Sequence, residues 1–371
     1  MLFYNLSENE HVLVPMRSII SHIYGLLFCS SNRIVRTGTW ISICLILFYC
    51  VVSQVLLCSC SKRFAEPEEE ELDIYSIEGL LKKPRLKVLD IGNSYSEGAL
   101  ALLPTVVKSC EAEVNDMCLY SLFRGGASFR SWCDVYEDID TLSYSFSRVI
   151  GDLSVSIPSG SCNAGDGSLF RRALSEVEWD FIIIHQVSTY APYYESWKGD
   201  DVGGCLEQLL EIIHKHQPNT KIGFLLVHSY WDDYIGNRER SSLERWQKIA
   251  DSIQFLKEDY NIQFIIPYGT AIENLRSSSM NNNYDLTSDG SHLECGLGQY
   301  TAACCYYESL ITPRTGISCY GSNVQIDVSD VESRYPAVNV TMENSKIAQK
   351  AAVLAVKDMF HCNNPELIAL E

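Results

Sequence analysis

Short, strongly apolar runs recur along this chain, and each is followed by a segment with the spacing of a helix. Such runs are typical of strands that are covered on both faces, as strands in a parallel sheet are. The helical segments supply the crossovers that parallel strands require. The expected strands lie at 86–91, 114–120, 181–186, 221–227 and 261–267. The sequence therefore predicts an α/β fold, a three-layer α/β/α sandwich with a mostly parallel five-stranded sheet.

Between these runs, the apolar residues follow the helical period. The segment from Tyr144 to Ile157 instead alternates apolar and polar residues, which favours a hairpin with its turn near Gly151 and Asp152. Residues 160–169 are expected to form a loop. The expected helices lie at 97–109, 168–180, 205–216, 242–256, 296–310 and 345–360.

Charge excludes one large class of partners. The chain has 47 acidic against 29 basic side chains, a net charge of −18, and 46% of its 371 residues are apolar. The apolar fraction is sufficient for a large core. Because the excess negative charge repels polyanions, we expect no nucleic acid and no anionic lipid surface as a partner.

The N-terminal segment has the features of an export signal. Arg33 and Arg36 precede an apolar stretch from Trp40 to Leu57, and small residues and cysteines follow. The sequence Leu-Cys-Ser-Cys that ends at Cys60 resembles a lipobox, so Cys60 is the expected lipidation site. A retained membrane anchor is the alternative. Either way, we expect an exported protein tethered at the cell envelope. With Cys60 lipidated, it is a periplasmic or outer-membrane lipoprotein.

The predicted domain organisation follows from these boundaries. Residues 1–60 form the signal, lipoprotein or anchor segment, and residues 61–84 form an acidic linker that includes the run EPEEEELD. The globular domain extends over 85–362, and a tail over 363–371 completes the chain. The fifteen cysteines show no zinc-type spacing, so neither a metal nor another cofactor is expected. Disulfides are compatible with export, but their pairing cannot be read from the sequence.

Polar side chains gather just after the expected strands. Ser94 follows the first strand, and the sequences RGGAS, HQVS and HSYWDD follow the next three. Because parallel strands end at one edge of the sheet, these segments are expected to meet there and to form a ligand site.

Asp289 and His292 provide what a nucleophilic serine requires. A serine needs a base, and that base needs a carboxylate that orients it. Asp289 precedes His292 by three residues, just ahead of an expected helix, so one turn can supply both groups. Each residue also has a simpler interpretation: Ser94 as a helix N-cap, with Ser96 as the nearest rival hydroxyl, and the acid and histidine as an ordinary surface pair.

Together these segments resemble the SGNH (GDSL-type) hydrolases, and more narrowly the exported proteins of gut Bacteroidetes that carry the domain of unknown function DUF4886. The resemblance covers roughly residues 85–360. Its segments are LDIGNSYSEGA, RGGASFRSW, WDFIIIHQVS, IIPYGTAIENLR and LTSDGSHLECGLGQYTAA. It implies ester hydrolysis through an acyl-enzyme, with Ser94 as nucleophile, His292 as base and Asp289 as its partner. Backbone amides of Ser94 and Gly126 (or Gly125) are then expected to form the oxyanion hole.

Two departures from the family pattern affect the oxyanion hole and the cleft. Asn93 stands where an aspartate is usual, and the Gly-x-Asn-Asp block is replaced by His185-Gln186-Val187-Ser188. Gln186 is therefore the predicted third oxyanion donor, because related carbohydrate esterases use a glutamine in this block. The predicted substrate cleft is formed by Asn93, His185, His228 and Trp231.

These features predict an exported serine esterase that removes acyl groups, above all O-acetyl groups, from glycans or small esters. The alternative is a catalytically inactive glycan-binding lipoprotein on the same scaffold. A lipase or thioesterase would need a wide apolar cleft, and an acyltransferase would use the same acyl-enzyme.

Overall fold

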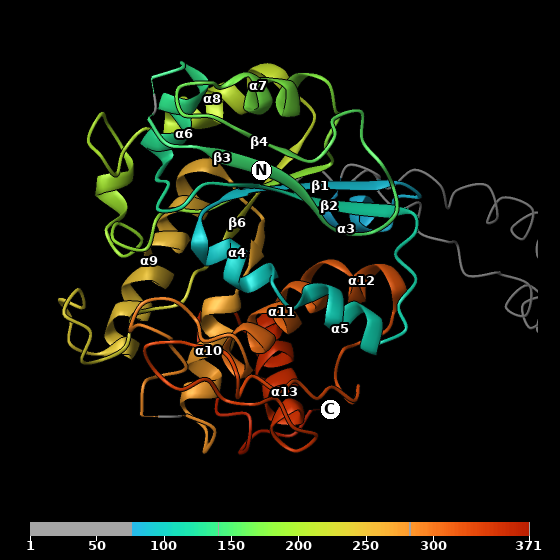
Figure 1. The fold of residues 1–371 in the computed structure, drawn as a ribbon, viewed down its shortest axis with the longest axis vertical. Coiled ribbons are helices and arrows are strands. Elements are labelled where there is room, and N and C mark those ends of the chain that lie inside the picture. Colours follow the sequence, from blue (N-terminus) through green and yellow to red (C-terminus); the bar gives the residue numbers. More distant parts are fainter. Residues whose placement is uncertain (1–75, 140, 282, 371) are drawn as a thin grey trace, which may run out of the picture. The chain divides into compact units, whose positions relative to one another are not determined.

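A single seven-stranded sheet organises the computed structural model, which describes residues 76–139, 141–281 and 283–370 (Figure 1). The strand order is β4-β3-β2-β1-β5-β6-β7. The strands are β1 (Leu86–Gly92), β2 (Met117–Phe123), β3 (Tyr144–Ile150), β4 (Gly160–Cys162), β5 (Phe181–Ile184), β6 (Lys221–Leu225) and β7 (Phe264–Ile266). Strands β2, β1, β5, β6 and β7 are parallel neighbours, which confirms the predicted parallel sheet.

The antiparallel edge of the sheet differs from the predicted hairpin. Strand β3 pairs with β2 and β4, and β4 lies in the segment that was expected to be a loop. The chain does turn at Gly151, which has a φ of 81°. However, the Leu153 amide then donates to the Met117 carbonyl at 3.2 Å, so the segment after the turn bonds to the start of β2 rather than to β3.

Helices cover both faces of the sheet. Helices α6 (Phe129–Tyr136), α7 (Ser168–Ser175) and α8 (Leu206–His216) contact one another on one face, and α4 (Ser94–Leu100), α5 (Leu103–Ser109), α10 (Tyr268–Arg276), α11 (Leu297–Leu310) and α13 (Asn344–Lys357) lie on the other (Figure 1). The remaining helices are α3 (Ile77–Leu81), the 3₁₀ helix η1 (Tyr194–Trp197), α9 (Ser242–Tyr260) and α12 (Thr312–Thr315).

The helix predicted at 97–109 is two helices, because α4 ends at Leu100 and α5 begins at Leu103 with a proline in its first turn. Proline has no amide hydrogen to continue the preceding helix, but it fits the start of a new one. This break lets α4 follow the end of β1 closely while α5 returns toward β2.

The folded part extends beyond the boundaries expected from composition. The last residues of the predicted linker form α3, whose Leu80 and Leu81 are buried. In the predicted tail, the Glu366 carboxylate accepts hydrogen bonds from the amide and hydroxyl of Ser279, both at 2.7 Å. The predicted signal or anchor segment, Cys60 and most of the linker lie outside the described residues. Within the described ranges, no helix is both long and apolar enough to cross a bilayer.

Candidate active site

The turn after β1 exposes the hydroxyl of Ser94. Gly92 ends the strand where no side chain fits, because a Cβ would lie 2.2 Å from Ser96 Oγ and 2.4 Å from His185 Nε2. Asn93 then caps α4: its Oδ1 accepts from the Tyr95 amide at 3.0 Å. Ser94 is therefore the first residue of the helix and is partly exposed.

A second turn presents Asp289 and His292. Asp289 Oδ1 accepts from the amides of Ser291 and His292, both at 2.8 Å, and its Oδ2 lies 2.7 Å from His292 Nδ1. One carboxylate oxygen thus holds the turn while the other orients the ring, which explains the spacing of three residues. Gly290 has a φ of 96°, and a Cβ there would lie 2.6 Å from the Tyr234 ring.

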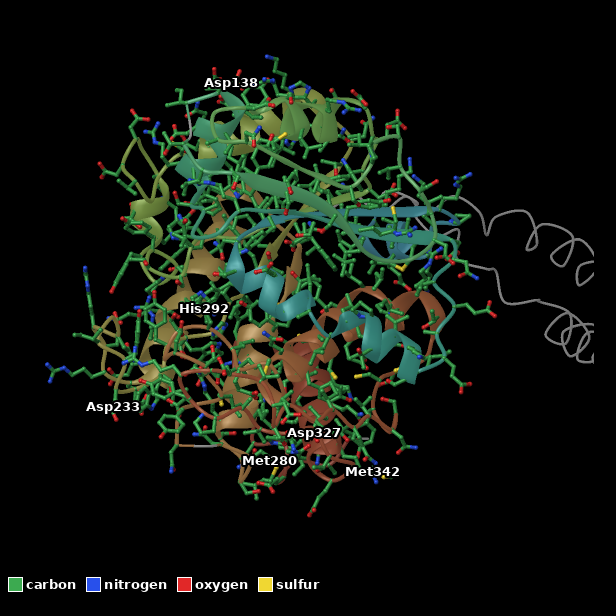
Figure 2. All side chains as sticks on the ribbon, viewed as in Figure 1. Asp138, Asp233, Met280, His292, Asp327 and Met342 are labelled. Carbon is green, nitrogen blue, oxygen red and sulfur yellow. The ribbon has the colours of Figure 1, made fainter. Side chains whose placement is uncertain are left out.

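The two turns meet at the start of α4, where His292 lies beside that helix (Figure 2). Ser94 Oγ lies 2.9 Å from His292 Nε2. With its Nδ1 hydrogen donated to Asp289, the neutral ring presents Nε2 as an acceptor for the Ser94 hydroxyl. The side chains of His292 and Asp289 are 44% and 40% exposed, so solvent reaches this chain of hydrogen bonds.

The Asp289 carboxylate is ionised over the whole neutral range. Partial burial acts to raise its pKa, but the hydrogen bonds from the His292 amide, the His292 ring and the Ser291 amide outweigh burial and lower the pKa to about 2. A fixed negative charge at this position stabilises the imidazolium that forms when His292 accepts a proton.

Tyr95, which sequence reasoning missed, and His228, which it assigned to the cleft, support the turn of His292 from beneath. The Ser291 carbonyl accepts from the Tyr95 hydroxyl at 2.6 Å and from His228 Nε2 at 2.8 Å. The Tyr95 and His228 rings stack with centroids 4.3 Å apart. Burial lowers the pKa of His228 well below its usual range, so the ring is neutral and Nε2 carries the hydrogen. Tyr95 thus ties the nucleophile helix to the turn of the base.

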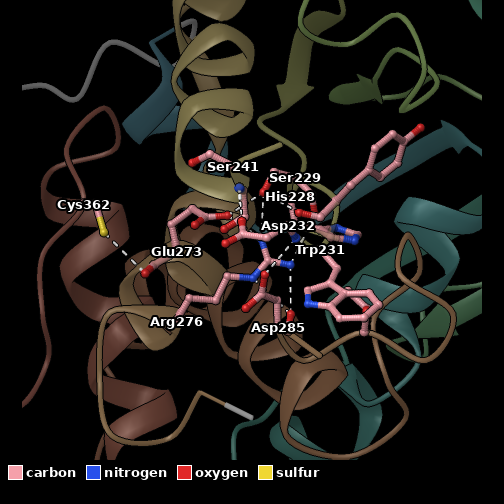
Figure 3. A network of polar contacts seen from close by, with 12 residues as sticks. His228, Ser229, Trp231, Asp232, Ser241, Glu273, Arg276, Asp285 and Cys362 are labelled. Atoms are coloured by element: carbon pink, nitrogen blue, oxygen red, sulfur yellow. Dashed lines mark hydrogen bonds and ion pairs between the residues drawn. The ribbon is translucent and has the colours of Figure 1, made fainter. Parts of the chain in front are cut away.

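Two further loops are braced by a buried network around Arg276 (Figure 3). Arg276 pairs with Glu273 and donates from Nε and Nη2 to the Asp285 carbonyl at 3.0 and 2.9 Å. Asp285 Oδ2 in turn accepts from the Asp232 amide at 3.1 Å. The network therefore joins α10 to the segment after β6 and to the segment that leads into the Asp289 turn. Its Glu273–Arg276 pair is local, but no sequence pattern signals the contact of Asp285 with Asp232, 53 residues away in the chain.

The turn that contains Gly126 lies against the nucleophile turn. The Arg124 amide donates to the Gly92 carbonyl at 3.1 Å, and Asn93 Nδ2 donates to the Ala127 carbonyl at 2.8 Å. Gly126 is exposed with a φ of 66°, and its amide has no hydrogen bond to the described residues. The Ser94 amide, at the first position of α4, lacks an intrahelical acceptor. Both amides are thus available, and their oxyanion role stays a prediction.

Gln186 does not fit the role of third oxyanion donor. Its side-chain Nε2 donates to the Gly203 carbonyl at 2.7 Å, and its Oε1 accepts from the Val187 amide at 2.9 Å. The side chain is buried and holds the loop that leads to α8. The prediction is corrected: this amide is engaged in loop structure, and in the described part of the chain it makes no bond to Ser94 or Gly126.

Three of the four predicted cleft residues are also buried. Both polar atoms of Asn93 bond to backbone, and His185 Nε2 accepts the Asn93 amide at 3.3 Å. Burial lowers the pKa of His185 to about 4, so the ring is a neutral acceptor. His228 lies behind the Ser291 carbonyl. These residues shape the turns and do not line a cleft, because their polar atoms are needed to satisfy buried backbone groups.

Trp231, the fourth residue of the predicted cleft, is partly exposed and lies beside the turn of Asp289. Its amide donates to the Gly290 carbonyl at 2.9 Å, and the Tyr335 amide donates to the Ser288 carbonyl at 3.0 Å. The Trp231 ring meets the rings of Tyr284 and Tyr335 edge to face, with centroids 5.5 and 5.3 Å away. An aromatic cluster is therefore attached to both neighbours of Asp289.

Asp90 is a buried acid below the nucleophile turn. Its Oδ2 accepts from the Tyr306 hydroxyl at 2.8 Å, and its Oδ1 has no partner within the described residues. Burial raises the pKa of Asp90 to about 6, although the hydrogen bond from Tyr306 opposes this shift. The folded protein therefore binds a proton here at a pH where the unfolded chain does not.

This shift predicts a specific pH dependence of stability. As pH rises from about 4 to about 6, the contribution of Asp90 to the free energy of unfolding falls by about 3 kcal/mol. The reason is that the unfolded chain releases this proton at a lower pH than the folded protein does. Asp90→Asn removes the titration. Denaturant unfolding of both proteins between pH 4 and 8 is expected to show a wild-type loss that the variant lacks. If the free energies of unfolding of wild type and Asp90→Asn changed with pH in the same way, the pKa of Asp90 would not be raised.

Among residues 76–139, 141–281 and 283–370, no group of three or more His, Cys, Asp or Glu side chains is arranged to hold a metal ion. Ser94, His292 and Asp289 are joined in the order that a nucleophile, a base and an orienting carboxylate require, and such an arrangement is capable of acyl transfer.

Comparison with known proteins identifies the family of this chain. The domain of unknown function DUF4886 matches residues 87–352, which confirms that part of the predicted resemblance. A DUF4886 family protein from Bacteroides uniformis has a similar crystal structure, with a TM-score of 0.60 and 24% identity over 77% of this chain and 100% of that chain. At this identity the likeness shows the fold alone.

Two other solved structures are less similar. For a proposed SGNH hydrolase from Slackia heliotrinireducens, the TM-score is 0.40 and the identity 16%, over 61% of this chain and 98% of that chain. For a variant of an acetyl-xylooligosaccharide esterase from Geobacillus, the values are 0.36 and 11%, over 62% and 96%. Among curated proteins, none matches the chain.

Proposed function

This chain belongs to the DUF4886 family, and we propose that it is a serine esterase in which Ser94, His292 and Asp289 act together. The observation that carries the proposal is the pair of hydrogen bonds that joins them, 2.9 Å from Ser94 Oγ to His292 Nε2 and 2.7 Å from His292 Nδ1 to Asp289 Oδ2. These distances are within the range for direct proton transfer.

The proposed reaction has two halves. Ser94 Oγ attacks the ester carbonyl, and its proton passes to His292 Nε2 while Asp289 stabilises the resulting imidazolium. Collapse of the tetrahedral intermediate breaks the ester bond, and His292 returns the proton to the leaving alcohol. Water then attacks the acyl-enzyme by the same route and releases the acid. The Ser94 and Gly126 amides are the proposed donors to the oxyanion in both halves.

The finer proposal is an O-acetyl ester on a glycan, cleaved at the cell envelope. Its support is the partly exposed aromatic cluster beside Asp289 and the signal-like N-terminal segment that ends at Cys60. Cys60 is the proposed point of lipid attachment. Aromatic rings suit the apolar faces of sugars, and the solvent-exposed His292 is accessible to a large substrate.

An inactive glycan-binding protein is the second candidate, and the position of Gln186 favours it. With that side chain engaged by Gly203 and Val187, two backbone amides are the proposed donors and no third donor has been assigned. Loss of one donor typically costs a factor of about 10²–10³ in kcat. The two candidate functions therefore differ in the expected rate of ester hydrolysis: a slow esterase still turns over its substrate, and a binding protein does not.

The test is hydrolysis of 4-nitrophenyl acetate, butyrate and octanoate by the full-length protein in a mild detergent. We expect turnover well above the blank, with the highest kcat/KM for the acetate, because the site opens to solvent and a longer chain gains little apolar burial. A preference for octanoate would indicate a lipase or thioesterase. Rates equal to the blank on all three esters would favour the binding protein.

A further inference from the structure

A cavity of about 270 Å³ extends along α4 on the face of the sheet that carries Ser94. Helix α4 contributes Glu97, and strands β2 and β3 contribute Ser121, Phe123, Ser145, Ser147 and Arg148. Three cavities of larger volume lie elsewhere in the described part, and neither this cavity nor those three are lined by Ser94, Asp289 or His292.

The cavity begins one helical turn from the nucleophile. Glu97 lies three residues after Ser94, so the two share a face of α4 and are separated by about 5 Å along the axis. At the other wall, Phe123 directly precedes Arg124, whose amide is bonded to the Gly92 carbonyl at 3.1 Å. A molecule that presents an ester to Ser94 can therefore reach into this cavity.

The floor of the cavity contains the hydroxyl of Ser121. Ser121 lies within the otherwise apolar strand β2 and is only 6% exposed. Its hydroxyl is not among the buried polar atoms of the described residues that lack a partner, so it is accessible from the cavity. A ligand that enters the cavity can bond to this hydroxyl in place of water.

The sheet register extends this polar floor. Ser121 pairs with Ser147 on β3, and Phe123 pairs with Ser145. Paired residues of neighbouring strands face the same side of a sheet, so the three serines point toward α4 together with the Phe123 ring. The surface offers hydroxyl groups beside the Phe123 ring, and Leu100, Ala101, Pro104 and Val149 complete its apolar part.

The charge at the rim disfavours anions and acyl chains. Glu97 lines the cavity and makes no ion pair in the described ranges, whereas Arg148 pairs in register with Tyr120, so its side chain faces the other side of the sheet. An anion would face Glu97. An acyl chain would cover the serine hydroxyls and the Glu97 carboxylate without replacing their hydrogen bonds to water. A ring with several hydroxyls can instead donate to Glu97 and to the serines and place its C–H face on Phe123.

We propose that this cavity binds one sugar ring, the alcohol portion of the ester whose acyl group is presented to Ser94. The inference rests on the proposed esterase function and names its substrate class. A volume of about 270 Å³ is just below the roughly 300–1,000 Å³ of pockets for drug-sized ligands, which suits a single ring rather than a buried chain.

The first test compares mono-O-acetylated glucose, galactose and xylose with ethyl acetate, which has no sugar. We expect at least one sugar acetate to have a kcat/KM more than tenfold above that of ethyl acetate. Ser121→Ala and Ser147→Trp should reduce that preference by about tenfold or more, while kcat/KM for 4-nitrophenyl acetate stays unchanged. Ser143→Ala, at an exposed serine just outside the cavity lining, is the matched control.

The outcomes separate this inference from the function on which it rests. No preference for any sugar acetate, or an equal loss on all esters in Ser121→Ala, would overturn the sugar subsite. If wild type fails to hydrolyse even 4-nitrophenyl acetate, the esterase proposal fails instead. Calorimetric titration with free glucose, galactose and xylose then tests the cavity directly: binding that Ser147→Trp abolishes supports the subsite, and no binding of any of them overturns it.

Discussion

Ser94→Ala is expected to reduce kcat for 4-nitrophenyl acetate by a factor of at least about 10⁴ in the full-length protein. The substitution removes the atom that lies 2.9 Å from His292 Nε2 and leaves the rest of the turn in place, because Asn93 still caps α4. The release of 4-nitrophenol measures kcat, and a thermal unfolding curve measures the stability of the variant. The unfolding temperature should stay close to that of wild type.

Ser96→Ala is the matched control for this change. Ser96 is two residues away on the same helix, but it is fully buried and its hydroxyl donates to the Asn93 carbonyl at 3.2 Å. We expect most of the activity to remain, with some loss of stability. Equal inactivation of both variants, or full activity in Ser94→Ala, would contradict the assignment of Ser94 as nucleophile.

Asp289→Asn is expected to lower kcat by about 10⁴ with a modest loss of stability, because the lowered pKa of Asp289 means that the fold favours the ionised carboxylate. The asparagine oxygen can still accept the amides of Ser291 and His292, so the turn is retained. Its NH₂ group, however, then faces His292 Nδ1 as a donor and forces the ring hydrogen onto Nε2. In that tautomer His292 cannot accept the Ser94 proton. The measurement is kcat and KM over pH 5–9, beside the unfolding temperature.

Ser291→Ala serves as the control at this turn. It removes a hydroxyl that lies 3.1 Å from Asp289 Oδ1 and 3.2 Å from His292 Nδ1, and it changes no charge. We expect less than a tenfold fall in kcat. Near-normal activity in Asp289→Asn would show that the base works without its carboxylate and would remove Asp289 from the mechanism.

The sequence predicted the parallel strands and the positions of Ser94, Asp289 and His292 because these features depend on local patterns. Apolar runs mark strands, a small residue after a strand marks a turn, and an acid three residues before a histidine fits one capped turn. The resemblance to SGNH hydrolases then indicated that these distant segments belong together, and their hydrogen bonds in the structure agree with that expectation.

The roles of the other polar residues could not be predicted in the same way. His185, His228 and Gln186 all follow buried strands, where the sequence suggests a ligand site, yet each one satisfies a backbone group of another segment. His185 accepts the Asn93 amide, His228 donates to the Ser291 carbonyl, and Gln186 donates to the Gly203 carbonyl. Nothing near a histidine in the chain tells whether its ring faces substrate or a distant carbonyl.

The sequence by itself determined the α/β class, the parallel strands and the candidate nucleophile, acid and base, because periodicity and turn chemistry act over a few residues. Only the tertiary structure decided that β3 pairs with β2, that Tyr95 and His228 clamp the Ser291 carbonyl and that Ser121 faces a cavity. The physical reason is that buried hydrogen bonds are made between segments far apart in the chain. A polar side chain therefore acquires its role from the group it meets after folding.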